Sequence, residues 1–216
     1  MTADEILDFC FPEGLADNLQ SHRAFWEWLM RGGADDDIRR RFRDLPDQIR
    51  SGAFGEWAAT PKGRLASILV LDQFPRSIFR DTAKAYAFDP MALDLAEQGL
   101  ACGHFSMLAH PWERTMFALP LVHAEGHTLR TRASMNVRLA RETLAMASDE
   151  LRPAYQFCLD QSRRHKEVID RFGRHPHRNK ILGRSPAVGE NSYLAGGNFP
   201  HQRAINLIGS TTGPST

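Results

Sequence analysis

The hydrophobic residues of this chain recur with the period of an α-helix along almost its whole length. Ile38, Phe42, Leu45 and Ile49, for example, are spaced to form one stripe of a single helix. No segment alternates between apolar and polar residues as a half-buried strand does, and no Asn-Gly or Asp-Gly pair marks a hairpin. The pattern therefore predicts an all-α protein without a sheet.

About seven or eight helices joined by short polar turns are expected, and no linker rich in Pro, Gly or Ser separates them into two groups. We therefore predict a single-domain helical bundle over residues 1–200 and a disordered tail over residues 201–216. Apolar residues cover nearly every side of the segment from Leu65 to Leu71, which predicts a central, buried helix. Another helix is expected to begin at an N-cap, Asp89, and to stop near Gly103. Further helices are expected over residues 111–125, 128–146 and 185–194, and another over residues 150–172 that is closed by Gly173.

The composition excludes several classes of protein. With 216 residues, 42% of them hydrophobic, and 27 Lys+Arg against 26 Asp+Glu, the chain is typical of a globular protein rather than a disordered or fibrous one. No apolar run approaches the ~18 residues of a membrane span, and the first residues lack the features of a signal peptide. Cys10, Cys102 and Cys158 are too few and too scattered for a disulfide framework or a thiolate zinc site. We therefore expect a soluble, cytoplasmic protein.

The first unusual segment runs from Leu71 to Arg80 and reads Leu-Asp-Gln-Phe-Pro-Arg-Ser-Ile-Phe-Arg. Pro75 must end the buried helix near Asp72 or Gln73. An aspartate at the negative end of a helix costs roughly 0.3–1 kcal/mol unless it has a partner, and Arg76 and Arg80 are the nearest candidates. Two interpretations stay open: an Asp–Arg clamp that fixes a tight turn, or a site in which an arginine holds an anionic group.

The second unusual segment contains His123, Glu125 and His127. The two histidines are four residues apart, as in helical metal sites, but Glu125 lies on the opposite face and no third ligand is marked nearby. We therefore expect no metal here. A histidine on an apolar stripe is either a hydrogen-bonded core residue or a general base, and the sequence leaves both readings open for His123.

The third segment, from Arg163 to Arg184, is strongly basic. It holds eight Lys or Arg residues against Glu167 and Asp170, a balance of 8 − 2 = +6. A solvated basic face would explain it, and so would a loop that binds a small anion through His177, Arg178 and Asn179. Nucleic acid is not expected as a partner, because no aromatic residues are interleaved for base stacking.

In this order, the three segments resemble those of the bacterial "domain of unknown function 924" family. The resemblance also rests on Ile6-Leu7-Asp8-Phe9, Gly52 to Trp57, Pro61 to Leu65, Thr82 to Ala87 with Asp89, and Leu119-Pro120-Leu121-Val122-His123, and it extends over residues 5–195. It implies a fold similar to tetratricopeptide-like helical arrays. It implies no reaction, since the chemistry of the family is not established.

The chain departs from that family at several positions. It has Phe9-Cys10-Phe11 where members usually carry Phe-Trp-Phe, and Ala124-Glu125-Gly126 where the usual pattern is Ser-Glu-Asp. Arg130 replaces a usual Gln, and His127 is an addition. A carboxylate and an amide are thus missing beside His123, which bears on any activity that the family shares.

Two functional hypotheses follow. In the first, a polar pocket binds or acts on a small anionic molecule by general acid–base catalysis, with neither a metal, a cofactor nor a covalent nucleophile. Its catalytic residues would be His123, Glu125 and Asp72, and its binding residues Gln73, Arg76, Arg80, His177, Arg178 and Asn179. In the second, a non-catalytic tetratricopeptide-like scaffold binds a peptide or protein partner, with Trp26, Trp28, Trp57 and Trp112 as anchors. Neither hypothesis involves a membrane.

Overall fold

A computed structural model describes residues 1–13, 15, 18–197 and 199–200. The expected disordered tail, residues 201–216, lies outside the described residues. Within them the chain forms helices and turns with no strand, so the predicted all-α class is confirmed. None of the helices in this part is long and apolar enough to cross a membrane.

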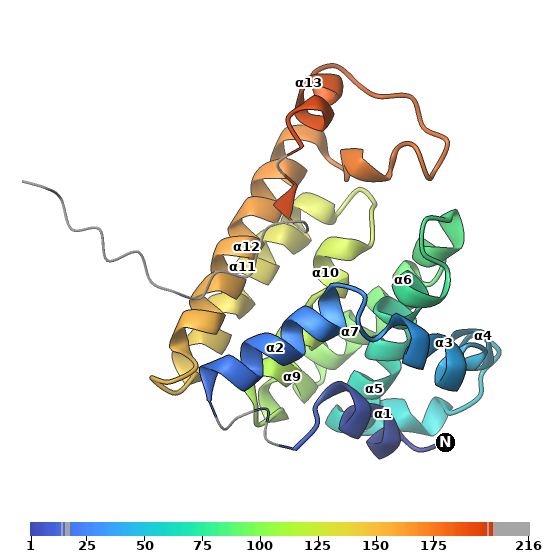
Figure 1. Cartoon of the computed structure of the whole chain (residues 1–216), viewed down its shortest axis with the longest axis vertical. Coiled ribbons are helices and arrows are strands. Elements are labelled where there is room, and N and C mark those ends of the chain that lie inside the picture. The colour runs from blue at the N-terminus through green and yellow to red at the C-terminus, as the bar shows by residue number, and fades with distance from the viewer. Residues whose placement is uncertain (14, 16–17, 198, 201–216) are drawn as a thin grey trace, which may run out of the picture.

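The described residues contain thirteen α-helices and three short 3₁₀ helices, η1 to η3 (Figure 1). The α-helices are α1 (Ala3–Cys10), α2 (Leu19–Met30), α3 (Asp35–Phe42), α4 (Leu45–Arg50), α5 (Pro61–Asp72), α6 (Phe74–Ile78), α7 (Asp89–Ala101), α8 (His104–Met107), α9 (Pro111–Ala118), α10 (Pro120–His123), α11 (Leu129–Met146), α12 (Arg152–Phe172) and α13 (Glu190–Ala195). The 3₁₀ helices are η1 (Gly55–Ala59), η2 (Ala83–Tyr86) and η3 (Pro176–Arg178).

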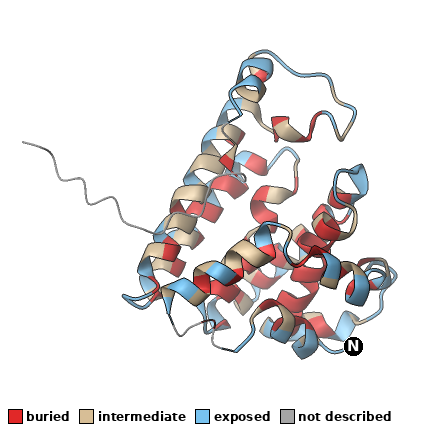
Figure 2. Ribbon diagram, in the orientation of Figure 1, coloured by how far each residue is buried: buried red, intermediate tan, exposed pale blue. Residues whose placement is uncertain are grey.

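The main hydrophobic core is built around α5. The residues from Leu65 to Val70 are almost fully buried, and the helix packs against α1, α7, α9 and η1. Figure 2 shows buried residues along α5 and on the sides of the neighbouring helices that face it. The predicted central, buried helix is therefore confirmed. Because α5 is apolar all round, polar groups at its end must find partners within the protein.

The two longest helices, α11 and α12, pack side by side as a hairpin along one side of the molecule (Figure 1). A small second core of Val122, Leu129, Ala133 and Ile169 joins α10 to this hairpin. Gly173, with φ of 70°, ends α12 as the sequence predicts. The chain then turns back toward α10 through the segment that contains η3.

The helix count exceeds the prediction, and two of the additional helices arise because expected helices are broken. The stripe from Ile38 to Ile49 is divided between α3 and α4, with Pro46 in the first turn of α4. The helix expected over residues 111–125 is divided between α9 and α10, with Pro120 at the first position of α10. A proline cannot donate the helical hydrogen bond and clashes with the preceding turn, so the hydrophobic period continues while the helix does not.

Two predicted helix starts are also wrong. α7 begins at Asp89 itself, and its N-cap is Phe88, with no capping side chain. The last helix, α13, begins at Glu190 rather than near Ser185. Both acidic side chains bind arginines from other segments of the chain, as described below.

Candidate functional site

Asp72 is the last residue of α5 and its side chain has no exposed surface. Its carboxylate accepts a hydrogen bond from the side-chain amide of Gln73 and forms an ion pair with Arg76, at 3.4 Å. Arg76 also donates to the backbone carbonyl of Asp72, which satisfies a carbonyl left free at the helix end. The Asp–Arg clamp, one of the two interpretations that the sequence leaves open, is therefore present.

The third partner of Asp72 is His123, the last residue of α10. Its Nδ1 atom lies 2.8 Å and 2.9 Å from the two carboxylate oxygens of Asp72. Burial alone would raise the pKa of Asp72, but the charge of Arg76 and the contact with His123 outweigh it and lower that pKa to about 2. The carboxylate is thus ionised, and as an acceptor it can only receive a hydrogen bond from an Nδ1–H of His123.

The other ring nitrogen of His123 is open. Nε2 has no hydrogen-bond partner among the described residues. It is also absent from the buried, unpaired polar atoms of these residues, so the atom itself is not buried. The side chain is 14% exposed, so this nitrogen faces solvent. A neutral imidazole held through Nδ1–H presents Nε2 as a proton acceptor. One side of the His123 ring is therefore buried and held by Asp72, and the other side is exposed at the surface.

A second carboxylate, Asp89, joins the arginines to this pair. Arg76 lies 2.9 Å from one Asp89 oxygen, and Arg178 of η3 lies 3.1 Å from the other. The same Arg178 donates to the backbone carbonyl of His123 at 2.8 Å. Its guanidinium lies 4.3 Å from the ring centroid of Tyr86. Burial lowers the pKa of Arg178, and Arg76 lowers it further, yet an arginine keeps its charge in proteins.

We call Asp72, Gln73, Arg76, Asp89, His123 and Arg178 the Asp72–His123 cluster. Two aspartates balance two arginines, so the cluster is neutral whenever His123 is neutral. Five of its six members are candidates from the sequence, brought together from α5, α6, α10 and η3. Asp89 is the member missed as a site residue, since an Asp-Pro pair at a helix start indicates a cap.

Glu125 lies outside this cluster. Its carboxylate accepts a hydrogen bond from the backbone N–H of His175 at 2.8 Å and forms an ion pair with Arg184. It therefore fastens the segment after α12 to the end of α10, and it makes no hydrogen bond to the His123 ring. No sequence pattern indicates His175 as an anchor, yet its buried ring donates from Nε2 to the carbonyl of Val122 at 2.7 Å.

The remaining candidates are also placed elsewhere. Arg80 pairs with Asp35 of α3 at 2.5 Å. Asn179 donates to Glu190 at 2.8 Å, and Glu190 also binds Arg174, whose hydrogen bonds lower the pKa of Glu190 to about 2. The His177 ring centroid lies 5.5 Å from that of His175. Of the expected anion loop, only Arg178 reaches the cluster.

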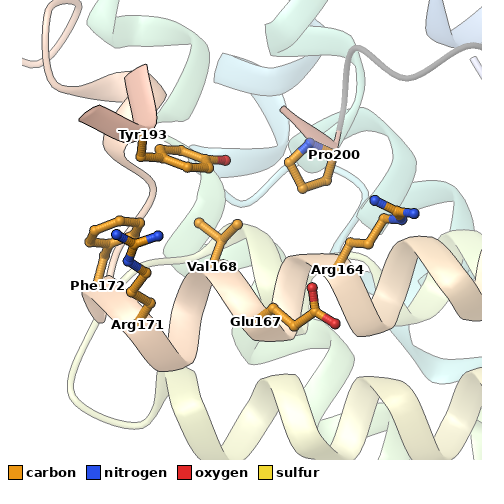
Figure 3. Close-up of a pocket in the computed structure, with 7 residues that line it drawn as sticks. All are labelled: Arg164, Glu167, Val168, Arg171, Phe172, Tyr193 and Pro200. Atoms are coloured by element: carbon orange, nitrogen blue, oxygen red, sulfur yellow. The ribbon is translucent and has the colours of Figure 1, made fainter. Parts of the chain in front are cut away.

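The described surface has a hollow of about 200 Å³, but it is not at the cluster. It lies against α12, and its lining residues are Arg164, Glu167, Val168, Arg171, Phe172, Tyr193 and Pro200 (Figure 3). The described residues contain no group of three or more His, Cys, Asp or Glu side chains that could hold a metal ion.

The comparisons with known proteins concern the family and the fold. Residues 6–198 match the family described as a bacterial protein of unknown function (DUF924). The chain is also similar to the solved structure of a protein of unknown function, ATU0120, from Agrobacterium tumefaciens. The two are 30% identical with a TM-score of 0.65, over 89% of this chain and 96% of that one. No curated protein matches the chain.

Proposed function

The chain belongs to the bacterial DUF924 family, and from that premise we propose that it acts by general acid–base catalysis on a small molecule with an anionic group. His123 is the base in this proposal, Asp72 orients it, and Arg76 holds the anionic group. The observation that carries the proposal is the contrast between the two nitrogens of His123. Nδ1 binds an ionised, fully buried carboxylate, while Nε2 is open to solvent.

The chemistry follows from that contrast. When Nε2 takes a proton from a substrate or from water, the imidazole becomes positively charged. The Asp72 carboxylate lies 2.8 Å away and stabilises that charge without moving. No serine or cysteine side chain of the described residues donates to His123, so the proton comes from the substrate or from water rather than from a protein nucleophile.

Arg76 is better placed than Arg178 to bind the substrate because it is the more exposed of the two arginines. Its side chain is 22% exposed, whereas that of Arg178 is 5% exposed. Since the cluster is neutral overall, affinity for an anion would depend on directed N–H donors rather than on excess positive charge. This favours a ligand with one small anionic group, such as a carboxylate or a phosphate ester.

The proposal is tested by hydrolysis of p-nitrophenyl phosphate, together with NMR titration of the His123 ring with acetate and phosphate. We expect His123→Gln to lower turnover by about 10²- to 10⁴-fold. The matched control is His127→Gln, because His127 is exposed and four residues further along. Equal turnover by wild-type protein and His123→Gln would contradict the proposal. So would the absence of turnover combined with no response of His123 to either anion.

A partner-binding, tetratricopeptide-like scaffold is the second proposal. Its expected anchors are less suited to that role, since Trp57 and Trp112 lie in the main core and Trp26 and Trp28 pack against it. The likeness to a tetratricopeptide array belongs to the scaffold proposal. We also propose a cytoplasmic location. All three cysteines are free thiols, which is compatible with a reducing compartment.

A further inference from the structure

The basic run from Arg163 to Arg184 is largely neutralised by the fold. Five of its eight cations form ion pairs with carboxylates: Arg163 with Asp160, Lys166 with Asp170, Arg174 with Glu190, Arg178 with Asp89, and Arg184 with Glu125. Besides Lys180, the cations of this run that form no ion pair with a carboxylate among the described residues are Arg164 and Arg171. Both of these line the hollow against α12.

The hollow has a defined arrangement of chemical groups. Arg164, Val168 and Arg171 follow one another along a single face of α12, as Figure 3 shows, so the hollow has a guanidinium on either side of an apolar centre. Glu167 lies on the same face and contributes one carboxylate. The balance of the lining is therefore two positive charges against one negative charge.

Tyr193 of α13 supplies an independent sign of a missing partner. Its hydroxyl is buried and has no hydrogen bond among the described residues, although its ring belongs to the hollow. Burial raises the pKa of Tyr193, so the hydroxyl keeps its proton and can donate it. Buried polar atoms in native proteins are nearly always paired, which makes this donor an indication of a ligand.

We propose that this hollow binds an acidic amino acid, a molecule with two carboxylates and one ammonium group. Arg164 and Arg171 each bind a carboxylate, Glu167 binds the ammonium group, and the Tyr193 hydroxyl donates to one carboxylate. The ligand carries a net charge of −1, which complements the net +1 of the lining. None of the lining residues belongs to the Asp72–His123 cluster, so this site is independent of the proposed catalysis.

The dimensions agree with this class of ligand. Residues seven apart on a helix are separated by about 10 Å along its axis, at about 1.5 Å per residue. An extended five-carbon diacid, with hydrogen bonds of about 2.8 Å to an arginine at each end, covers such a span. A monocarboxylate engages one arginine only, and a long peptide would exceed a volume of about 200 Å³.

The test compares L-glutamate with glutarate, which has both carboxylates but no ammonium group, by isothermal titration calorimetry on the full chain. We expect wild-type protein to bind L-glutamate about tenfold more tightly than glutarate, and Glu167→Gln to remove that preference. Arg164→Gln and Arg171→Gln should each weaken L-glutamate binding by about tenfold. Arg163→Gln is the matched control, since it removes the same charge from a neighbouring residue that pairs with Asp160.

The possible results separate clearly. A preference for L-glutamate that disappears in Glu167→Gln, with no effect of Arg163→Gln on binding, supports the proposed binding site. Equal binding of the two ligands by wild-type protein, equal weakening by Arg163→Gln, or no binding of either ligand would each overturn it. Hydrolysis by His123 plays no part in this measurement, so its result is separate from that of the proposed function.

Discussion

Replacing Arg178 should destabilise the protein more than any surface charge would. Its side chain is 5% exposed, and it joins η3 to α7 through Asp89 and to α10 through the carbonyl of His123. In Arg178→Met the volume of the stem is kept, while the ion pair, the carbonyl hydrogen bond and the contact with Tyr86 at 4.3 Å are lost.

The magnitude follows from what each partner retains. Breaking a buried ion pair costs about 3–5 kcal/mol when the other charge is left uncompensated. Asp89 keeps Arg76 at 2.9 Å, so the loss should lie near the lower limit, about 3 kcal/mol. For a chain of this size, that corresponds to a fall in Tm of about 6–12 °C.

Urea and thermal unfolding, followed by circular dichroism, measure this loss directly. Arg178→Lys keeps the charge but not the planar fork, so its loss should be intermediate. Lys180→Met is the control, because Lys180 is exposed in the same segment, and it should change stability by no more than about 0.5 kcal/mol. A loss below about 1 kcal/mol in Arg178→Met would refute the reasoning that this arginine holds the segment in place.

Two further predictions concern pH and packing. Burial, together with Arg178 and His177, lowers the pKa of His175 well below its usual value, so the unfolded chain binds a proton that the folded chain does not. Above pH ~6.5 this difference in proton binding does not affect the free energy of unfolding, and below that pH the free energy should fall by up to about 1.4 kcal/mol per pH unit. In His175→Gln the slope of the free energy of unfolding against pH should decrease. An unchanged slope would argue against a buried, neutral ring. A Cβ at Gly99 would lie 2.4 Å from the Phe117 ring, so Gly99→Ala should lower the free energy of unfolding by about 1–3 kcal/mol in the same urea titration. A Cβ at Gly55 would meet no atom within 4 Å, so Gly55→Ala should be nearly neutral.

The fold could be predicted from the sequence where local signals agree. The all-round apolar surface of α5 and the glycine that ends α12 each depend on nearby residues, and both are as expected. Helix breaks were less predictable. The stripe from Ile38 to Ile49 keeps its period across the turn between α3 and α4, so periodicity alone does not show the break.

The site was harder to predict, since it depends on which charges meet across long distances in the sequence. Arg76 and Arg80 were equal candidates for Asp72, but α6 ends at Ile78 and Arg80 pairs with Asp35 instead. Asp89 and Arg178 are 89 residues apart, and no local pattern indicates their contact. Glu125 stands two residues beyond the end of α10, which directs it toward Arg184 rather than toward His123.

The central claim is that Asp72 holds His123 with its proton on Nδ1 and its Nε2 free. The direct test is the ¹⁵N NMR spectrum of the His123 ring at a pH at which the ring is neutral, in wild-type protein and in Asp72→Asn. We predict the Nδ1–H tautomer in the wild-type protein, because the Asp72 carboxylate can only accept a hydrogen bond. Asp72→Asn places an amide donor there and should shift the proton toward Nε2. A wild-type ring protonated on Nε2, or the same tautomer in both proteins, would contradict the claim.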